Sequence, residues 1–228
     1  MCTVVCRFEA GDAIRILALR DEFVSRAFDE PDAWWPDQPT VIGGRDHVAG
    51  GSWCVSDVAS GRTALVVNRV ERFEGAPSRG RLPLAAVADG DGWTSTIDHR
   101  AMASFNLVLA GPDGVVVWLW DATALQRLDL APGTHMITSR GVDADDAKTV
   151  RFAPLFEQRP WLDVVTSCSP SVEDSALVVR RELPERTYAT VFGQSITSAP
   201  GSLRVAHSRT PWQDGTWVDQ TWPQMIAG

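Results

Sequence analysis

The feature that most constrains the fold is a series of short apolar, β-branched runs separated by turn residues. Clear examples lie at Thr3–Phe8, Ile14–Leu19, Thr63–Asn68 and Val115–Trp120. Runs of this kind bounded by Gly, Pro and Asp predict strands. Further strands are expected at residues 40–42, 53–55, 105–110, 126–130, 135–138, 176–183, 188–196, 203–207 and 216–222. About ten or more short strands predict an α+β fold with two stacked sheets and helices outside them.

Two or three helices are expected between these strands. Pro83 lies within one candidate segment, so that helix should start near Leu82, because proline suits a first helical turn. A second helix should open at the acidic residues 143–146 and end before Pro160. A short helical turn is expected at residues 97–103, and the stretch 161–173 is predicted to be a loop.

Length and charge exclude several classes of protein. A chain of 228 residues with 44% apolar and 22% charged residues fits one domain over residues 1–228. The net charge of −8 argues against nucleic acid as a partner, and the apolar runs are too short to span a membrane. Charged residues at Arg7, Glu9 and Asp12 occupy the place of a signal peptide's apolar region. We therefore expect a cytoplasmic protein.

The cysteines and histidines do not follow a metal-binding spacing. There are four of each, and none of them forms a zinc-like motif. No metal or cofactor is therefore expected, and the expected partner is a small-molecule substrate or ligand. The sequence does not specify an oligomeric state.

Cys2 follows directly after the initiator methionine. A small second residue favours removal of Met1, which would leave Cys2 with both a thiol nucleophile and a free α-amine to act as its base. An α-amine has a pKa of about 7.7–8.0, so it needs only a small shift to accept a proton at neutral pH. The alternative is a small buried thiol in a core strand.

The first two predicted strands form a hairpin that lays residues near 19–21 beside Cys2. Arg20 and Asp21 then bring charges to the end of a buried strand. A charge cluster at a strand end is also typical of a solvated turn. The apolar residues Phe23 and Val24 that follow make a purely solvated turn less favourable, and both interpretations stay open.

Other residues have both a functional and a structural interpretation. Asn68 ends an apolar strand, where its amide and backbone N–H could stabilise an oxyanion or form a turn. Trp34 and Trp35 lie in a proline-rich loop, where they could line a substrate wall or cap the core. Gly50 and Gly51 indicate a close approach of two backbones at a strand entry.

Several short motifs occur in the order of one known family. They are Met-Cys-Thr at 1–3, Leu-Arg-Asp-Glu at 19–22, Gly-Gly-Ser-Trp at 50–53, Leu-Val-Val-Asn at 65–68, Ser-Arg-Gly at 78–80, Phe-Asn-Leu at 105–107 and Ala-Pro-Gly-Thr at 131–134. The first 150 residues or so thus resemble the NRDE, or transport-and-Golgi-organisation, family. The last third of the chain matches only loosely.

The resemblance implies an N-terminal nucleophile (Ntn) hydrolase-like αββα sandwich, similar to the choloylglycine hydrolase and penicillin V acylase group. It implies that Cys2 attacks a C–N bond of a small amphipathic amide, with its own α-amine as base. Arg20 would stabilise the thiolate, Asp21 would hold the α-amine, and Asn68 would contribute to the oxyanion hole.

The chain departs from the family pattern at three positions. Leu19 replaces the asparagine of the signature, and Ser139 stands where an asparagine often follows the Pro-Gly-Thr turn. Val191 replaces an arginine near the C-terminus. The resemblance therefore implies Ser139 as a shorter oxyanion donor, and the loss of one such donor typically slows a reaction by about 10²–10³-fold.

A second interpretation keeps the fold without catalysis. The resemblance also implies haem or acyl-lipid binding and trafficking, and ten tryptophans could line an apolar cavity. A third is an interaction surface, for which the sequence shows no dedicated feature.

Overall fold

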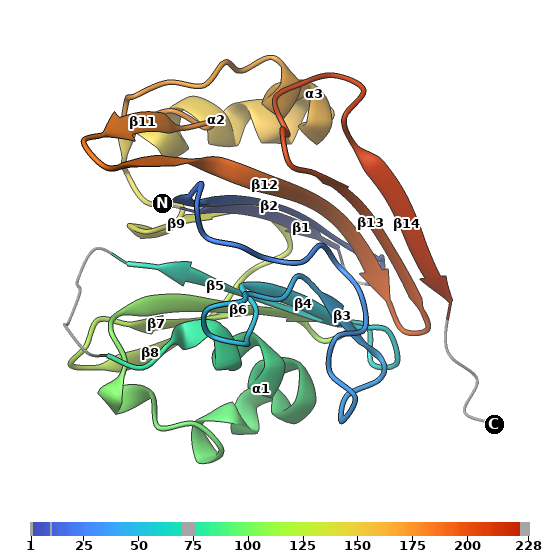
Figure 1. Ribbon diagram of the computed structural model, residues 1–228. Coiled ribbons are helices and arrows are strands. Elements are labelled where there is room, and N and C mark those ends of the chain that lie inside the picture. The colour runs from blue at the N-terminus through green and yellow to red at the C-terminus, as the bar shows by residue number, and fades with distance from the viewer. Residues whose placement is uncertain (1, 10, 70–75, 224–228) are drawn as a thin grey trace.

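A computed structural model of the chain describes residues 2–9, 11–69 and 76–223 and arranges them as two stacked sheets with helices outside (Figure 1). The described part of the first sheet has eight strands. In spatial order these are β10 (Gly141–Val142), β9 (Gly133–Thr138), β1 (Thr3–Phe8), β2 (Ile14–Phe23), β12 (Arg186–Ala199), β13 (Ser202–Ser208) and β14 (Val218–Pro223), with β11 (Arg180–Leu183) paired to β12.

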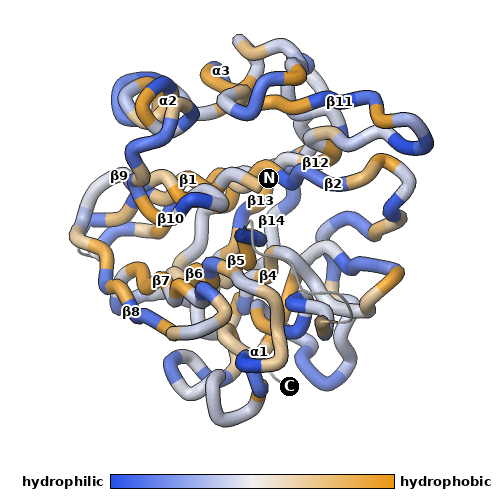
Figure 2. The backbone as a smooth tube through the Cα atoms, turned by 90° about the vertical axis from the view of Figure 1, so that its left-hand side faces the viewer, coloured by the Kyte–Doolittle hydropathy of each residue, from blue (hydrophilic) through white to orange (hydrophobic). Residues whose placement is uncertain are grey.

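The second sheet has six strands in the described part of the chain, all joined to their neighbours as antiparallel pairs. In spatial order these are β3 (Val41–Gly43), β4 (Cys54–Asp57), β5 (Arg62–Asn68), β6 (Phe105–Gly111), β7 (Gly114–Trp120) and β8 (Leu125–Asp129). The edge strands β8 and β11 carry mostly hydrophilic, exposed residues (Figure 2). Polar edges of this kind discourage pairing with another chain.

Helices cover the outer face of each sheet (Figure 1). The first sheet is covered by α2 (Ala147–Gln158) and α3 (Trp161–Thr166). The second is covered by the 3₁₀ turn η1 (Arg79–Arg81), helix α1 (Leu82–Asp89) and the 3₁₀ turns η2 (Gly90–Ser95) and η3 (His99–Ala101). The result is the αββα layering expected for an α+β fold.

Alternation along the strands divides the apolar residues among three cores. In β2, Ile16 and Ala18 face the other sheet, whereas Leu17 and Leu19 face α2 and α3. A third core, which includes Trp93, lies between the second sheet and α1. The central core contains residues of both sheets and holds them against each other.

Most of the strand predictions hold, and β2 is an informative exception. β1 has the predicted bounds, but β2 continues to Phe23 instead of ending at Leu19. The reason is β12, which pairs with β2 as far as Tyr188 opposite Phe23. Arg20 and Asp21 therefore lie inside a central strand and are both buried, so the solvated-turn interpretation was wrong.

Two predictions near the C-terminal third were also wrong. Residues 161–173 were expected to be a loop, but α3 forms at Trp161–Thr166 because its apolar residues recur at helical spacing over the first sheet. The strand expected at 176–183 begins only at Arg180, and residues 176–179 are buried outside the named strands. Helix α2 begins at Ala147, where the Asp146 side chain caps it.

The predicted close approach at Gly51 is confirmed. A Cβ added to Gly51 would lie 2.4 Å from the backbone of Gly80, and Ser52 N–H donates to the Gly80 oxygen at 2.8 Å. Gly51 needs to be glycine because the loop before β4 touches the backbone of η1 there, and a Cβ on Gly80 would also be tight, at 3.3 Å from Gly51. Among the helices that the structure describes, none is long and apolar enough to cross a membrane.

Candidate active site

The pairing of β1 with β2 brings Cys2 beside Arg20. Thr3 lies opposite Leu19, so one further step in this antiparallel register places Cys2 across from Arg20. The Cys2 Sγ lies 3.9 Å from the backbone oxygen of Asp21, to which it donates. The predicted position of residues 19–21 beside Cys2 is thus confirmed.

The side chains of Arg20 and Asp21 point to opposite faces of the sheet, because successive strand residues alternate. Arg20 shares the face of Ala18, toward the other sheet, and Cys2 packs against the same central core. Asp21 shares the face of Leu19, toward α2 and α3. The thiol therefore has the guanidinium on its own side of the sheet and the carboxylate on the other.

Arg20 is held between two aromatic rings. Its guanidinium carbon lies 4.5 Å from the ring centroid of Trp53 and 4.9 Å from that of Phe28. Its Nη2 lies 3.5 Å from Asp46 and 3.7 Å from Glu22. Burial lowers the pKa of Arg20 from its high ordinary value, although nearby acids oppose the change. A cation in this position is fixed in place before any ligand arrives.

Asp21 is anchored by the neighbouring strand β12. Thr190 Oγ1 donates to Asp21 Oδ1 at 2.6 Å and accepts from Val179 N–H at 2.8 Å. The Tyr188 hydroxyl donates to the backbone oxygen of Asp21 at 3.2 Å. A shift in register between Thr190 and Phe192 marks this point of the strand. These contacts fix the orientation of the buried carboxylate.

A cavity of about 390 Å³ opens beside Cys2. It lies between the turn that joins β9 to β10, the start of α2 and the loop before β11. Besides Cys2 it is lined by Thr138, Ser139, Arg140, Asp146, Ala147, Lys148, Glu173, Asp174 and Ser175. A volume of this size fits a small organic molecule.

Ser139 and Cys2 both line this cavity. Ser139 is buried and follows the last residue of β9. The Asn106 side chain, in the second sheet, donates to the Thr138 backbone oxygen at 2.7 Å. The turn that carries Ser139 is thereby tied to the opposite sheet.

Asn68 is not brought to Cys2. Its side chain is exposed, and by alternation it shares the outer face of the second sheet with Ala64 and Val66. It is not among the described residues that line the cavity. The neighbouring strand instead supplies the buried Asn106, which lies opposite Val67.

The two adjacent tryptophans also lie away from the cavity lining. Trp34 stacks on Arg45, with 4.6 Å between the guanidinium carbon and the ring centroid, and its indole N–H donates to the backbone oxygen of Glu30. Trp35 packs against the core between the second sheet and α1. For Trp35, the interpretation as a cap on the core therefore fits better than the interpretation as part of a substrate wall beside Cys2.

The Cys2 thiol is not ionised by its surroundings alone. Partial burial raises the pKa of the Cys2 thiol, and the carboxylate of Asp21 acts in the same direction. The hydrogen bond to the Asp21 backbone and the charge of Arg20 oppose this rise without cancelling it. A base is therefore needed to take the thiol proton at neutral pH.

The described residues contain no group of three or more His, Cys, Asp and Glu side chains that could hold a metal ion.

The sequence profile named Transport and Golgi organisation 2 matches residues 1–195.

The chain belongs to the Transport and Golgi organisation 2 family.

The family match covers every residue of the candidate site and ends within β12. A solved structure of the Caenorhabditis elegans N-acylethanolamine-hydrolyzing acid amidase (NAAA) ortholog aligns with 98% of this chain and 99% of that chain. The alignment has 12% sequence identity and a TM-score of 0.46. No curated protein sequence matches the chain.

Within this family member, Lys148 is a site residue that the sequence analysis missed. It is buried on the wall of the Cys2 cavity, and its Nζ donates to Thr3 Oγ1 at 3.3 Å. The Asp146 cap fixes the first turn of α2 by accepting from the Lys148 N–H at 2.9 Å. A lysine in the first turn of an amphipathic helix gives no sequence signal of burial.

Proposed function

We propose that this chain is a cytoplasmic amidohydrolase formed by one domain over residues 1–228, with Cys2 as its N-terminal nucleophile after removal of Met1. The observation that carries the proposal is the cavity of about 390 Å³ that Cys2 lines, together with the buried Arg20, which lies across from Cys2 in the adjoining strand. The NRDE resemblance supports the same Ntn-type site, similar to that of choloylglycine hydrolase and penicillin V acylase.

The proposed reaction proceeds through a thioester. The thiol proton moves to the α-amine nitrogen of Cys2, and the sulfur attacks the amide carbon, forming a C–S bond and an oxyanion. Collapse of this intermediate breaks the C–N bond, and the leaving amine takes the proton from the α-ammonium group. Water then hydrolyses the thioester, which yields a carboxylic acid and restores the thiol.

Each neighbouring residue has a proposed role. Arg20 favours the thiolate by its charge, on the face of the sheet that Cys2 shares. Asp21 holds the α-amine, and Thr190 orients its carboxylate. Ser139 stabilises the oxyanion, because it lines the cavity with Cys2. Asn68 is less well placed for that role, since its side chain is exposed on the outer face.

The lining supports a small amphipathic amide as the substrate. Lys148 provides a buried cation on the wall, suited to a carbonyl or carboxylate oxygen of the substrate. Glu173 and Asp174 are exposed and form the acidic rim. The proposed substrate therefore has its polar oxygen toward Lys148 and its amide carbon at Cys2.

The test combines intact mass, labelling and turnover. We expect the purified chain to lack Met1, to react with N-ethylmaleimide at Cys2, and to hydrolyse octanoyl or phenylacetyl 4-nitroanilide. Cys2→Ala should abolish turnover, and Cys168→Ala should not, because that partly buried thiol lies outside the cavity lining. A retained Met1 with an unreactive Cys2, or equal turnover by Cys2→Ala, would overturn the proposal.

One observation favours a non-catalytic alternative on the same fold. The pKa of the Cys2 thiol is raised, so without a base the sulfur stays protonated and binds ligands only as a weakly polar group. Under this alternative the chain binds haem or an acyl lipid as cargo. Quenching of tryptophan fluorescence by haemin or acyl-CoA at micromolar concentration, without hydrolysis, would support it.

A further inference from the structure

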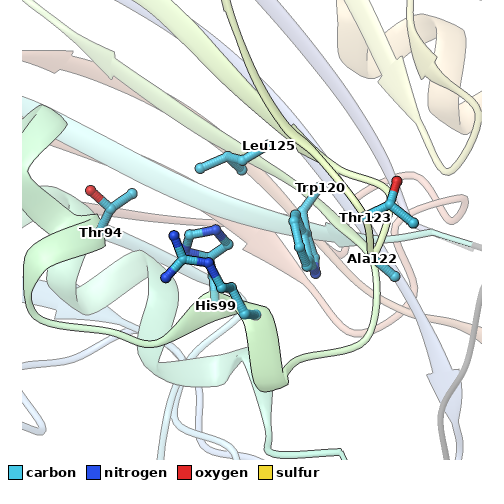
Figure 3. Close-up of a pocket in the computed structure, with 7 residues that line it drawn as sticks. Thr94, His99, Trp120, Ala122, Thr123 and Leu125 are labelled. Carbon is cyan, nitrogen blue, oxygen red and sulfur yellow. The ribbon is translucent and has the colours of Figure 1, made fainter.

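A second cavity, of about 630 Å³, lies on the helix-covered side of the second sheet (Figure 3). It occupies the region where β7 turns into β8, beside η2 and η3. Its lining consists of Thr94, His99, Arg100, Trp120, Ala122, Thr123 and Leu125. It shares no described lining residue with the Cys2 cavity.

One part of this second cavity is apolar and rigid. Figure 3 shows Trp120 and Leu125 facing the same space as His99. The Trp120 indole N–H donates to the Met102 backbone oxygen at 3.1 Å, so the indole ring is held in place. The His99 and Trp120 rings meet edge to face at a centroid distance of 4.9 Å. An apolar group can therefore pack against a preformed surface.

The turn beside this surface is also fixed. The Asp121 carboxylate accepts hydrogen bonds from the Thr123 N–H at 2.8 Å and the Ala124 N–H at 2.7 Å. Ala122, between Asp121 and Thr123, has a φ of 75°, a conformation that residues other than glycine rarely adopt. The turn at residues 121–124, which forms one wall of the cavity, therefore keeps a defined shape although Ala122 is strained.

The polar part of the lining offers positive charge and donors. Arg100 is exposed, and its guanidinium makes no hydrogen bond or ion pair with any residue that the structure describes. Thr94 adds an exposed hydroxyl. None of the seven lining residues carries a carboxylate. Such a lining complements a ligand that carries acceptor oxygens and negative charge.

His99 completes the polar part. It is only 7% exposed, and its Nδ1 has no hydrogen-bond partner among the described residues. Burial lowers the pKa of His99, so the ring is uncharged at neutral pH. Arg100 is therefore the cation of this lining.

We propose that this second cavity binds a small organic carboxylate with an apolar body. The carboxylate pairs with Arg100 at the exposed side, and the body packs on Trp120 and Leu125. The mixed lining favours such an amphipathic anion over an inorganic one, because phosphate leaves the apolar wall uncovered. The proposal does not depend on any chemistry at Cys2.

The test is an NMR titration of the ¹⁵N-labelled full chain with three probes. They are 3-phenylpropionate, its neutral analogue 3-phenylpropionamide, and inorganic phosphate. We expect 3-phenylpropionate to bind with a Kd of about 0.1–1 mM, as its size allows, and to shift the backbone amides of residues 94–100 and 121–125. The amide and phosphate should each bind at least about fivefold more weakly.

Two variants and a control locate the interaction. Arg100→Gln should weaken binding of 3-phenylpropionate by at least about fivefold, and Leu125→Ser should weaken it too. Arg81→Gln, an exposed arginine outside the cavity lining, should leave the affinity unchanged. Equal binding of acid and amide, no effect of Arg100→Gln, shifts that map to the Cys2 cavity, or no saturable binding would each overturn the proposal.

Discussion

The side-chain amide of Asn106 donates a hydrogen bond to the backbone oxygen of Thr138 at 2.7 Å, across the gap between the two sheets. Its oxygen accepts from Arg69 at 3.2 Å, so both ends of the amide are used. Asn106 is completely buried in an otherwise apolar strand. This polar contact sets the position of Ser139 relative to the rest of the cavity.

Removing this contact should destabilise the fold. Asn106→Ala leaves the Thr138 oxygen without its donor in a buried place, so we expect a loss of about 2–3 kcal/mol in the free energy of unfolding. Urea denaturation followed by tryptophan fluorescence measures it. Asn68→Ala, on the adjacent strand but exposed, should change stability by less than about 0.5 kcal/mol. Equal effects of the two substitutions would contradict the assigned role.

Thr190→Val tests the anchoring of Asp21. The substitution keeps the shape but removes the hydroxyl that donates to Asp21 and accepts from Val179. We expect a loss of about 2 kcal/mol in unfolding free energy and slower turnover of any amide substrate. The matched control is Thr197→Val, on the exposed face of the same strand, which should be nearly neutral. A stable, fully active Thr190→Val would show that the orientation of Asp21 does not matter.

Arg20→Gln tests the buried cation. The substitution removes the contacts with Trp53 and Phe28, so we expect a loss of about 2–4 kcal/mol in unfolding free energy. It should also slow alkylation of Cys2 by iodoacetamide, because the charge of Arg20 lowers the pKa of that thiol. Arg15→Gln, an exposed position on the same strand, should cost less than about 1 kcal/mol. An unchanged rate of alkylation in Arg20→Gln would show that Arg20 does not affect the reactivity of the Cys2 thiol.

The turn at Asp121 gives a pH-dependent prediction. The Thr123 hydroxyl and two backbone N–H groups lower the pKa of Asp121 to about 2. Because the pKa is lower in the folded state, the stabilisation is present above the ordinary aspartate pKa and is lost as the pH falls toward 2. An NMR titration of the carboxyl carbon should show this value, and Thr123→Val should raise it. Thr96→Val, whose hydroxyl donates to Asp89, should not.

Much of the fold was predictable because the strands alternate and turns bound them. The bounds of β1 and its pairing with β2 followed from local residues alone. The length of β2 did not, because residues 20–23 are strand only through pairing with β12, far along the chain. The helix α3 was missed since its six residues are too few for periodicity to identify.

The site was predictable where it depends on the hairpin and unpredictable where it depends on distant partners. Lys148 meets Thr3 across 145 positions, and Asn106 meets Thr138 across 32. Nothing local marks either contact, although an asparagine inside the apolar run of β6 was a signal of a buried polar role. Asn68 is the opposite case. Its position at a strand end suggested a site residue, but did not reveal which face of the sheet its side chain occupies.

The first strand of the chain lies in the interior of its sheet, with β9 and β2 on either side. During synthesis, β1 can pair with β2 early, but its other edge must wait until Gly133–Thr138 leaves the ribosome. Until that segment emerges, the growing chain exposes one edge of an apolar strand. Expression at lower temperature, or with a chaperone that shields nascent chains, should raise the yield of soluble protein.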